Sequence, residues 1–419
     1  MAEQHEKALV PQIRFTGFTD PWEQCKFSEL VDRVTVASND PLLPQVEYED
    51  INSGEGTLNK DLGKKDGGKT GILFEPGDIL YGKLRPYLMN WLHPQFRGIA
   101  IGDFWVLRPS GAEGTCLYRL IQSDSFQRLA DISSGSKMPR ADWSLISSGE
   151  FLIPSDDAEQ RRIGAFLDRL DSLITLHQRK YDKLCVLKKS MLDKMFPKGG
   201  SLYPEIRFAG FTDPWEQRKL EDYVVVSTAK NVDGRFNKED VLSVSGEYGI
   251  VNQIAFQGRS FAGSSVLNYG IVNTGDIVYT KSPLNSNPYG IIKVNKGIPG
   301  IVSTLYAVYR PQDNVHTNFI QVYFEQHERM NNYMHPLVNK GAKNDMKVTA
   351  ENALKGVVTF PSREEQVIIS EFFDRLDSLI TLHQRKYDGC ANPLFSERRI
   401  SCRKPSHQNR CSATTTPSG

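Results

Sequence analysis

The sequence predicts an α+β protein built from two tandem, mixed α/β modules and two long helices that pair with each other. Three observations support this prediction. Two blocks of sequence occur twice, an apolar stripe with a seven-residue period follows each module, and short β-type runs fill most of the remainder. The chain has 419 residues, which is enough for about two to three domains at roughly 150 residues each.

The duplication is the most informative feature of the sequence. IRFTGFTDPWEQ at 13–24 returns as IRFAGFTDPWEQ at 206–217, and DRLDSLITLHQRKYD at 168–182 returns unchanged at 374–388. The stretches between these blocks share only scattered positions, such as the Gly-Asp-Ile of 77–79 and 275–277. Uniform drift would not spare fifteen consecutive residues and erase most of their neighbours. The pattern therefore predicts two specialised modules on one constant frame.

The constant frame is predicted to be helical. The central helix begins near Ser155 and ends at Phe196-Pro197, and residues on its stripe recur every seventh position. Such a stripe specifies a helix that packs against another helix. The histidines at 177 and 383 are open to two interpretations, as metal ligands or as polar residues that set the register of the pair, and we favour the second. The predicted helix-pairing residues are Ile163, Leu170, His177, Leu184, Met191, Ile369, Leu376 and His383.

Each module is predicted to begin with strands and to end with helices. Apolar β-type runs broken by Gly, Pro and Asn occupy 71–84, 104–109, 275–281 and 303–311. Helical patterns follow near 115–132 and 318–334.

Composition and charge limit the function. Hydrophobic residues make up 39% and charged residues 24%, as in ordinary globular proteins. No apolar run approaches the roughly 18 residues that a membrane helix needs, and the N-terminus lacks a secretory pattern, so we expect a cytoplasmic protein with no membrane partner. Lys and Arg total 51 against 50 Asp and Glu, so any DNA-binding charge must be segregated onto faces. The six cysteines, without a CxxC pair, predict free thiols rather than a zinc site or disulfides.

One motif suggests an enzyme. Gly63–Thr70 matches the phosphate-binding pattern G-x-x-x-x-G-K-[ST], which requires a buried strand before it and a helix after it. Here a polar, Gly-rich stretch precedes the loop and a strand-like run follows, so a solvated basic loop is the favoured interpretation and a nucleotide-binding NTPase the alternative. A Lys69→Ala variant separates the two, because only an NTPase would lose nucleotide binding.

A second motif and the remaining residues give no catalytic site. Asn287-Pro288-Tyr289 faintly suggests an amino-methyltransferase motif, but it lacks the second Pro and is predicted to be a turn. Catalytic carboxylate pairs, nucleophile elbows and metal-ligand sets are not evident. We therefore expect no catalytic residue, cofactor or metal in this chain.

What remains is typical of nucleic-acid contact. Basic residues follow the β-type runs and occupy polar loops at matching places in the two halves, where they can neutralise phosphates or reach base edges. For any single residue, a solvated loop is about as good an interpretation. The predicted DNA-contacting residues are Lys64, Lys65, Lys69, Lys83, Arg85, Lys137, Arg140, Lys281, Lys340, Lys343 and Lys347.

Four blocks together resemble the specificity (S) subunit of type I restriction–modification systems: IRFxGFTDPWEQ, GDILYGKLRPYL, GDIVYTKSPLNSNPYGII with GIVSTLYAVYRP, and EQRRIGAFLDRLDSLITLHQRK. The resemblance implies two target-recognition domains separated by two conserved helices, which form an antiparallel coiled coil with pseudo-twofold symmetry. It also implies a bipartite, interrupted target in double-stranded DNA. The implied partners are methyltransferase (modification) subunits and restriction subunits, with S-adenosylmethionine, ATP and Mg bound to those partners.

The resemblance gives the expected domains. They are target-recognition domain 1 (1–154), the central conserved helix (155–197), target-recognition domain 2 (198–361), a truncated distal conserved helix (362–388) and a divergent tail expected to be disordered (389–419). A coiled-coil adaptor with no DNA role would leave the two divergent modules unexplained.

The C-terminus departs from the family pattern. After Asp388 the apolar period vanishes, and three of the six cysteines fall in the remaining residues. Our hypothesis is a frameshift or recombination junction that shortens the distal helix and weakens both the coiled coil and the docking of partners.

Overall fold

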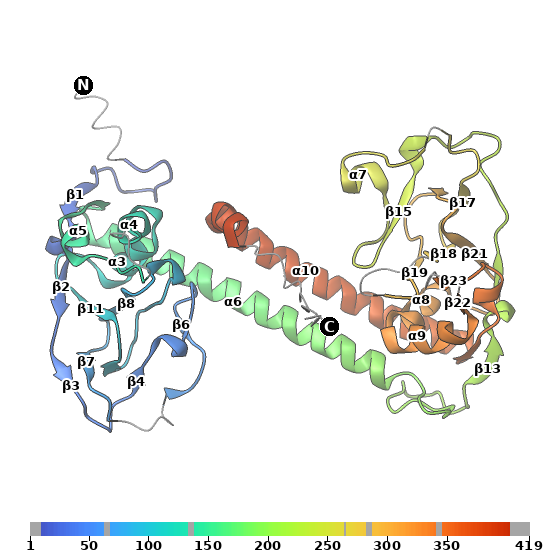
Figure 1. The fold of residues 1–419 in the computed structure, drawn as a ribbon, viewed down its shortest axis with the longest axis horizontal. Coiled ribbons are helices and arrows are strands. Elements are labelled where there is room, and N and C mark those ends of the chain that lie inside the picture. Colours follow the sequence, from blue (N-terminus) through green and yellow to red (C-terminus); the bar gives the residue numbers. More distant parts are fainter. Residues whose placement is uncertain are drawn as a thin grey trace, which may run out of the picture. The chain divides into compact units, whose positions relative to one another are not determined.

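The chain divides into two compact units, Met1–Leu173 (unit 1) and Ile174–Gly419 (unit 2). This computed structural model describes residues 10–62, 68–132, 138–263, 265–281, 287–340 and 346–402, without the side chains of 339–340, 346–347 and 388–402. Each unit combines small sheets with helices (Figure 1), so the fold is α+β as the sequence predicts. The division into two target-recognition domains, two conserved helices and a tail stays a prediction.

Unit 1 begins with strands and ends with helices. Its helices are α2 (Phe27–Leu30), α3 (Gly114–Gln122), α4 (Asp124–Ala130), α5 (Trp143–Ser148) and the first part of α6 (Asp157–Lys194). Its strands are β1 (Glu23–Lys26), β2 (Val31–Val34), β3 (Ala37–Ser38), β4 (Gln45–Val46), β5 (Ile51–Asn52), β6 (Thr57–Leu58), β7 (Gly71–Phe74), β8 (Ile79–Gly82), β9 (Trp91–Leu92), β10 (Gly98–Ala100), β11 (Phe104–Pro109) and β12 (Glu150–Ile153).

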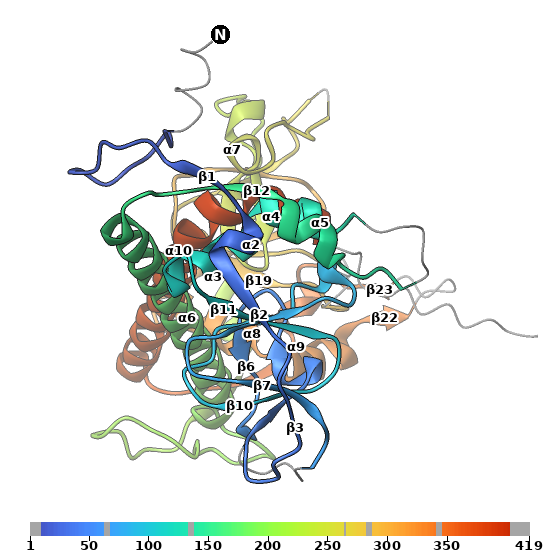
Figure 2. The same ribbon diagram turned by 90° about the vertical axis from the view of Figure 1, so that its left-hand side faces the viewer.

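Two four-stranded sheets form the centre of unit 1 (Figure 2). One has the antiparallel order β2-β11-β8-β9 and the other the order β3-β7-β10-β4, in which β10 and β4 are parallel. Strand β8 is buried along its whole length, and so are the first four residues of β11. Continuous apolar runs such as ILYG and FWVL form these central strands because both of their faces are covered.

Unit 2 repeats this order of elements. Its helices are the remainder of α6, α7 (Gln253–Gln257), α8 (Thr317–Glu325), α9 (His327–Met334) and α10 (Arg363–Cys402). Its strands are β13 (Glu216–Lys219), β14 (Val224–Val226), β15 (Leu242–Ser245), β16 (Gly249–Asn252), β17 (Gly270–Val272), β18 (Ile277–Tyr279), β19 (Ile292–Val294), β20 (Gly300–Val302), β21 (Ala307–Pro311), β22 (Asn339–Lys340), β23 (Met346–Lys347) and β24 (Val357–Phe360).

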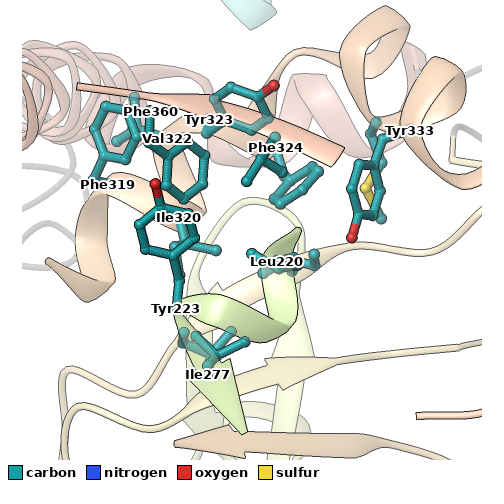
Figure 3. Close-up of a cluster of buried hydrophobic side chains, with 14 of the residues drawn as sticks. Leu220, Tyr223, Ile277, Phe319, Ile320, Val322, Tyr323, Phe324, Tyr333 and Phe360 are labelled. Atoms are coloured by element: carbon teal, nitrogen blue, oxygen red, sulfur yellow. The ribbon is translucent and has the colours of Figure 1, made fainter. Parts of the chain in front are cut away.

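The central sheet of unit 2 has the order β14-β21-β18-β19, which repeats β2-β11-β8-β9 of unit 1. Aromatic rings from α8 pack between this sheet and β24 (Figure 3). The ring of Phe360 lies 4.9 Å from that of Phe319 and 5.0 Å from that of Tyr323, measured between centroids. The predicted helical stretches at 115–132 and 318–334 are confirmed, each as two short helices, and the predicted β-type runs contain β7, β8, β11, β18 and β21.

The repeated Gly-Asp-Ile is a turn that leads into a central strand. Gly77 and Gly275 have φ values of 88° and 89°, a region that glycine adopts without strain. The carboxylate that follows accepts a backbone hydrogen bond from three residues earlier, at 2.8 Å in both copies. Asp78 also accepts two 2.8 Å hydrogen bonds from Arg108.

A second repeated contact joins the two constant blocks of each copy. Arg14 donates two 2.7 Å hydrogen bonds to Glu159 in unit 1, and Arg207 donates bonds of 2.8 and 2.7 Å to Glu365 in unit 2. Both glutamate side chains are 1% exposed. Because a buried carboxylate is stable only with a partner, each arginine is kept together with its glutamate. The constant frame predicted from the duplication is therefore a physical repeat.

Both long helices differ from the expected boundaries. Helix α6 begins at Asp157 rather than at Ser155, because Asp156 Oδ1 accepts a 2.6 Å hydrogen bond from the Ala158 N–H. Helix α10 continues to Cys402, beyond the predicted end at 388. The apolar stripe marks only the stretch in which a helix packs against a partner helix. The backbone hydrogen bonds of a helix are local, so α10 can continue beyond that stripe without a partner. The expected tail from residue 403 lies outside the described residues.

Candidate nucleic-acid interface

A carboxylate at the start of β11 holds two of the predicted cations of unit 1. Asp103 Oδ1 lies 3.6 Å from Lys83 Nζ, and its Oδ2 accepts a 2.9 Å hydrogen bond from Arg140 Nη2. The backbone fixes the same arrangement, because the Lys83 N–H donates to the Asp103 carbonyl at 2.9 Å and its own carbonyl accepts from Ala141 at 2.8 Å. Two cations share one carboxylate, so the group retains a positive charge.

Arg85 projects from a constrained turn beside this group. Its φ is 53°, in the left-handed region that non-glycine residues rarely adopt. The Arg85 N–H donates a 2.7 Å hydrogen bond to the Pro139 carbonyl, which fixes the turn against the segment that carries Arg140. Tyr87, two residues later, is 54% exposed. An exposed cation and an exposed ring on one fixed turn are suited to a phosphate and a base.

The two aromatic residues of the segment 81–87, which also carries Lys83 and Arg85, have different roles. The sequence interleaves Tyr81 and Tyr87 with cations, but only Tyr87 is exposed. Tyr81 lies in β8, is 1% exposed and stacks on Trp105 with ring centroids 5.8 Å apart. Tyr81 therefore belongs to the buried strand, whereas Tyr87 is open to solvent.

Tyr48 positions the basic group, although the sequence did not select it. Its hydroxyl donates a 2.5 Å hydrogen bond to the Asp103 carbonyl and accepts one of 3.2 Å from the Leu84 N–H. Burial raises the pKa of Tyr48 to about 12, so the hydroxyl stays protonated and can donate at neutral pH. No local pattern marks this tyrosine, because its partners lie 36 and 55 residues away.

Lys69 pairs with Glu47, the residue before Tyr48 in the chain, with its Nζ 2.5 Å from Oε1 of Glu47. Its side chain is 64% exposed. Strand β7 begins at Gly71, directly after the Gly63–Thr70 loop, where a phosphate-binding loop would require a helix. The other predicted cations of the polar loops lie outside the described residues: Lys64, Lys65, Lys137 and Lys343.

Lys281 occupies the position in unit 2 that Lys83 occupies in unit 1. It follows β18 as Lys83 follows β8, and its φ is 49°. Its Nζ donates a 3.3 Å hydrogen bond to the Thr304 carbonyl. Burial and, to a smaller degree, the nearby charge of Lys230 lower the pKa of Lys281. The sequence did not select Lys230, because it lies about fifty positions earlier in the chain.

The remaining predicted cations of unit 2 lie on a hairpin. Strands β22 and β23 pair antiparallel, with Asn339 opposite Lys347 and Lys340 opposite Met346. The backbone therefore brings Lys340 and Lys347 onto one two-stranded ribbon. The Asn287–Tyr289 motif of the same unit is a turn, closed by a 2.9 Å hydrogen bond from the Gly290 N–H to the Asn287 carbonyl.

The predicted helix-pairing residues fall into two groups. Ile163 and Leu170 lie on the part of α6 that belongs to unit 1 and are partly buried. The others lie in unit 2, where α6 and α10 are side by side (Figure 1). Among these, Ile369 and Leu376 are buried, whereas His177, Leu184, Met191 and His383 are partly buried.

Three contacts give the direction of the two helices in unit 2. His177 Nδ1 lies 2.9 Å from His383 Nδ1, Lys188 Nζ lies 2.6 Å from Asp377 Oδ1, and the rings of Phe196 and Phe373 are 6.3 Å apart. As the residue number along α6 rises, the number of the contacting residue on α10 falls, so the two helices are antiparallel where they touch. A 2.9 Å separation of two ring nitrogens is a hydrogen bond in which one ring donates its proton to the other.

The described part of the chain shows few other chemical sites. Cys25, Cys116 and Cys185 are free thiols. Within the described residues there is no group of three or more His, Cys, Asp or Glu side chains arranged to hold a metal ion. None of the described helices combines the length and the apolar character needed to cross a membrane.

Comparisons with known proteins identify the fold. No protein-family model matches the sequence, and no curated protein matches it significantly. Solved structures do match, and three of them are described here. An S subunit from M. genitalium has a TM-score of 0.56 at 12% identity, covering 91% of this chain and 96% of that one. The HsdS subunit from Thermoanaerobacter tengcongensis has a TM-score of 0.39 at 19% identity, covering 88% and 93%.

The third match comes from a structural study of complex assembly and conformational transition of the type I restriction–modification system. Its TM-score is 0.43 at 16% identity, with 91% of this chain and 96% of that chain covered. The M. genitalium subunit alone exceeds a TM-score of 0.5 among the three, and its match extends over nearly the whole of both chains. The resemblance found in the sequence is thus confirmed at the level of structure: the chain has the fold of a type I restriction–modification S subunit.

Proposed function

We propose that this chain is the DNA sequence-specificity subunit of a type I restriction–modification complex and that it reads a bipartite, interrupted target. One observation carries the proposal: the two units repeat the same frame and present a lysine after the same central strand, Lys83 after β8 and Lys281 after β18. A reader of two half-sites needs two modules that present corresponding edges to one duplex, as dimeric DNA-binding proteins do. The shared fold with the M. genitalium S subunit supports this function.

Each unit would hold the phosphate backbone of DNA with its basic residues and select bases with its loops. Exposed Arg85 and Arg140 in unit 1 are available to phosphates, and Tyr87 is available to bases. The strands behind these residues are shared between the two units, whereas the loops differ in sequence. The two halves of the target would therefore differ in base sequence.

The long helices would set the distance between the half-sites. In unit 2 they are antiparallel, and the predicted stripe continues along α6 to Leu170 and Ile163. An antiparallel coiled coil over the full stripe would fix the gap and provide a docking surface for methyltransferase and restriction subunits. S-adenosylmethionine, ATP and Mg would then belong to those partners, and this chain would be a cytoplasmic scaffold without catalytic groups of its own.

The salt dependence of binding to duplex DNA tests whether the basic residues around Lys83 in unit 1 and Lys281 in unit 2 contact phosphates. Each phosphate contact adds about 0.9 to the slope of log affinity against log salt. Arg140→Ala and Lys281→Ala should each lower this slope by about that amount, since each removes one cation from the proposed surface.

Arg97→Ala is the matched control. Arg97 pairs with Glu75 at 3.0 Å, before the start of β8 and thus at the opposite end of that strand from Lys83. Its loss should leave the slope unchanged. Equal slopes for all three variants and the unmodified chain would contradict the proposed interface.

A further inference from the structure

Helix α7 and the hairpin of β15 and β16 expose a group of aromatic side chains in unit 2 (Figure 1). The ring of Phe256 lies 5.3 Å from that of Tyr248, measured between centroids, and the two residues are 46% and 59% exposed. Phe261, 57% exposed, has the guanidinium carbon of Arg259 4.5 Å from its ring centroid. We call these four residues the α7 group. Single exposed apolar residues are common on proteins, but a group of neighbouring ones indicates a binding surface.

The backbone holds the α7 group in place. Asn252 caps helix α7, because its Oδ1 accepts a 3.0 Å hydrogen bond from a backbone N–H of the first turn. Gly258 ends the helix at a φ of 75°. Gln253 joins the following segment to β15, since its Oε1 accepts from the Phe261 N–H at 2.7 Å and its Nε2 donates to Ser243 Oγ at 3.0 Å. The rings are therefore presented from a fixed backbone.

The α7 group belongs to a part of unit 2 that unit 1 does not repeat. In both units a 3₁₀-helix precedes the hairpin, Tyr48–Asp50 in unit 1 and Lys238–Asp240 in unit 2. The last aspartate of each accepts a 2.8 Å hydrogen bond from the backbone N–H that precedes the 3₁₀-helix. Beyond the hairpin, unit 2 forms α7, whereas the described residues 59–62 and 68–70 of unit 1 form no α-helix. A partner that binds both units alike needs a repeated surface, so the α7 group is suited to a ligand that differs between the units.

The proposed function supplies a ligand of this kind. The two halves of a bipartite target differ in base sequence, and base edges are read in the grooves of the duplex. The major groove is about 12 Å wide and admits a helix or a two-stranded ribbon, whereas the minor groove is about 6 Å wide. Helix α7 and its hairpin therefore fit the major groove.

Arg259 favours DNA over an apolar protein surface as the occupant. Its side chain is exposed, and its guanidinium lies over the Phe261 ring. A dry apolar partner would bury this cation without a counter-charge, which is costly. Phosphate oxygens or the acceptors of guanine can instead accept from its N–H groups while the rings contact the bases.

The exposed rings are suited to thymine. A wedge between two base pairs requires a ring that can enter alone, but Phe256 packs on Tyr248 and a guanidinium covers Phe261. Rings that stay in the groove can contact the apolar group that base pairs present there, which is the C5 methyl of thymine. On the basis of the proposed function, we propose that the α7 group lies in the major groove of the half-site that unit 2 reads and contacts thymine methyl groups.

Replacement of thymine by uracil tests the proposal, because uracil lacks only the C5 methyl. The target motif is first selected from a random duplex library by the complex of this chain with its methyltransferase subunits. The motif is then synthesised with uracil in one half-site at a time, and the affinity of the same complex for each duplex is titrated. In one half-site, each contacted methyl that is lost should weaken binding about fourfold, as expected for one buried CH₂-sized group.

Phe256→Ala should weaken binding to the thymine duplex and remove the difference between thymine and uracil in that half-site. Tyr248→Ala should act in the same direction, because it removes the ring that packs on Phe256. Ile298→Ala is the matched control. Ile298 is 72% exposed and follows β19 in the same unit, so the difference should stay.

Equal affinity of the unmodified chain for thymine and uracil in both half-sites would overturn the proposal. It would leave the proposed function standing and would indicate a protein as the occupant of the α7 group. This comparison does not depend on the folding of any variant. A difference that Phe256→Ala and Tyr248→Ala both leave unchanged would also overturn the proposal. Failure of the complex to select any motif would overturn the proposed function together with it.

Discussion

The side chain of Asp103 shows how one residue can lower the net positive charge of the group that Lys83 and Arg140 form in unit 1. Its carboxylate is within reach of Lys83 and Arg140 and partly neutralises both. The backbone carbonyl of the same residue accepts from Lys83 and Tyr48, and these bonds do not need the carboxylate. A change at this side chain therefore alters the charge and leaves the strand connection in place.

Asp103→Asn should strengthen binding to duplex DNA. Removing one negative charge about 4 Å from the contacts changes the interaction by about 1 kcal/mol in water, or about fivefold in affinity at low salt. Titration of labelled duplex DNA measures it. Asp32→Asn makes the same charge change on β2, opposite Arg108 near the other end of β11, and should have little effect. Weaker binding by Asp103→Asn would show that Lys83 and Arg140 do not face DNA.

The individual residues that the sequence identified are those with local signals. Lys83 and Lys281 follow apolar runs that form strands, and the Gly-Asp turn precedes those runs in both copies. Tyr48 and the Arg14–Glu159 pair could not be found in this way, because they depend on contacts between distant positions, 145 residues apart for the pair. Lys230 was missed for the same reason.

At the scale of elements, the end of α6 stabilises unit 2. Phe196→Ala would leave a cavity among Trp215, Phe319 and Phe373, which should lower the free energy of unfolding by about 3–5 kcal/mol. Val186→Ala, within α6 and at a side chain that is 70% exposed, should change it by less than about 0.5 kcal/mol. Denaturant unfolding of both variants measures the difference. Similar small effects would show that the helix end is not part of the core.

The histidine pair should make the helix contact sensitive to pH. Burial, His383 and the charges of Lys386 and Lys180 lower the pKa of His177 below its ordinary value of 6.5. A lowered pKa in the folded state means that the neutral form is favoured there. The stabilisation of the folded state is complete above about pH 6.5. It is lost as the pH falls toward the lowered pKa that His177 has in the folded chain.

Amide hydrogen exchange in 174–194 should therefore be faster at pH 5.5 than at pH 7.5, after correction for the intrinsic rate. His177→Gln should reduce this dependence, whereas His335→Gln, at an exposed histidine of the same unit, should not. An identical pH response of the unmodified chain and His177→Gln would exclude the pair as its cause.

Element boundaries were less predictable than element types. The apolar period located α6 and the first part of α10, because pairing requires that pattern. It did not give the end of α10, since helical hydrogen bonds form within the segment itself. The start of α6 shifted by two residues because Asp156 and not Ser155 caps it.

At the scale of the whole molecule, the duplicated sequence blocks predicted two repeated units, and the structure shows the contacts and the strand order that the two units repeat. The repeated blocks pair through Arg14–Glu159 and Arg207–Glu365, and the central sheets share one strand order. The loops that would read bases diverge between the copies. No rule of spacing or periodicity relates such loops to a base sequence, so the target has to be measured.

Selection from a random duplex library by the complex of this chain with its methyltransferase subunits tests the central claim most directly. We expect one enriched motif with two defined parts separated by a gap of constant length. Arg140→Ala should weaken selection for one part and Lys281→Ala for the other. An uninterrupted motif, or a motif whose two parts both weaken with either substitution, would contradict the account.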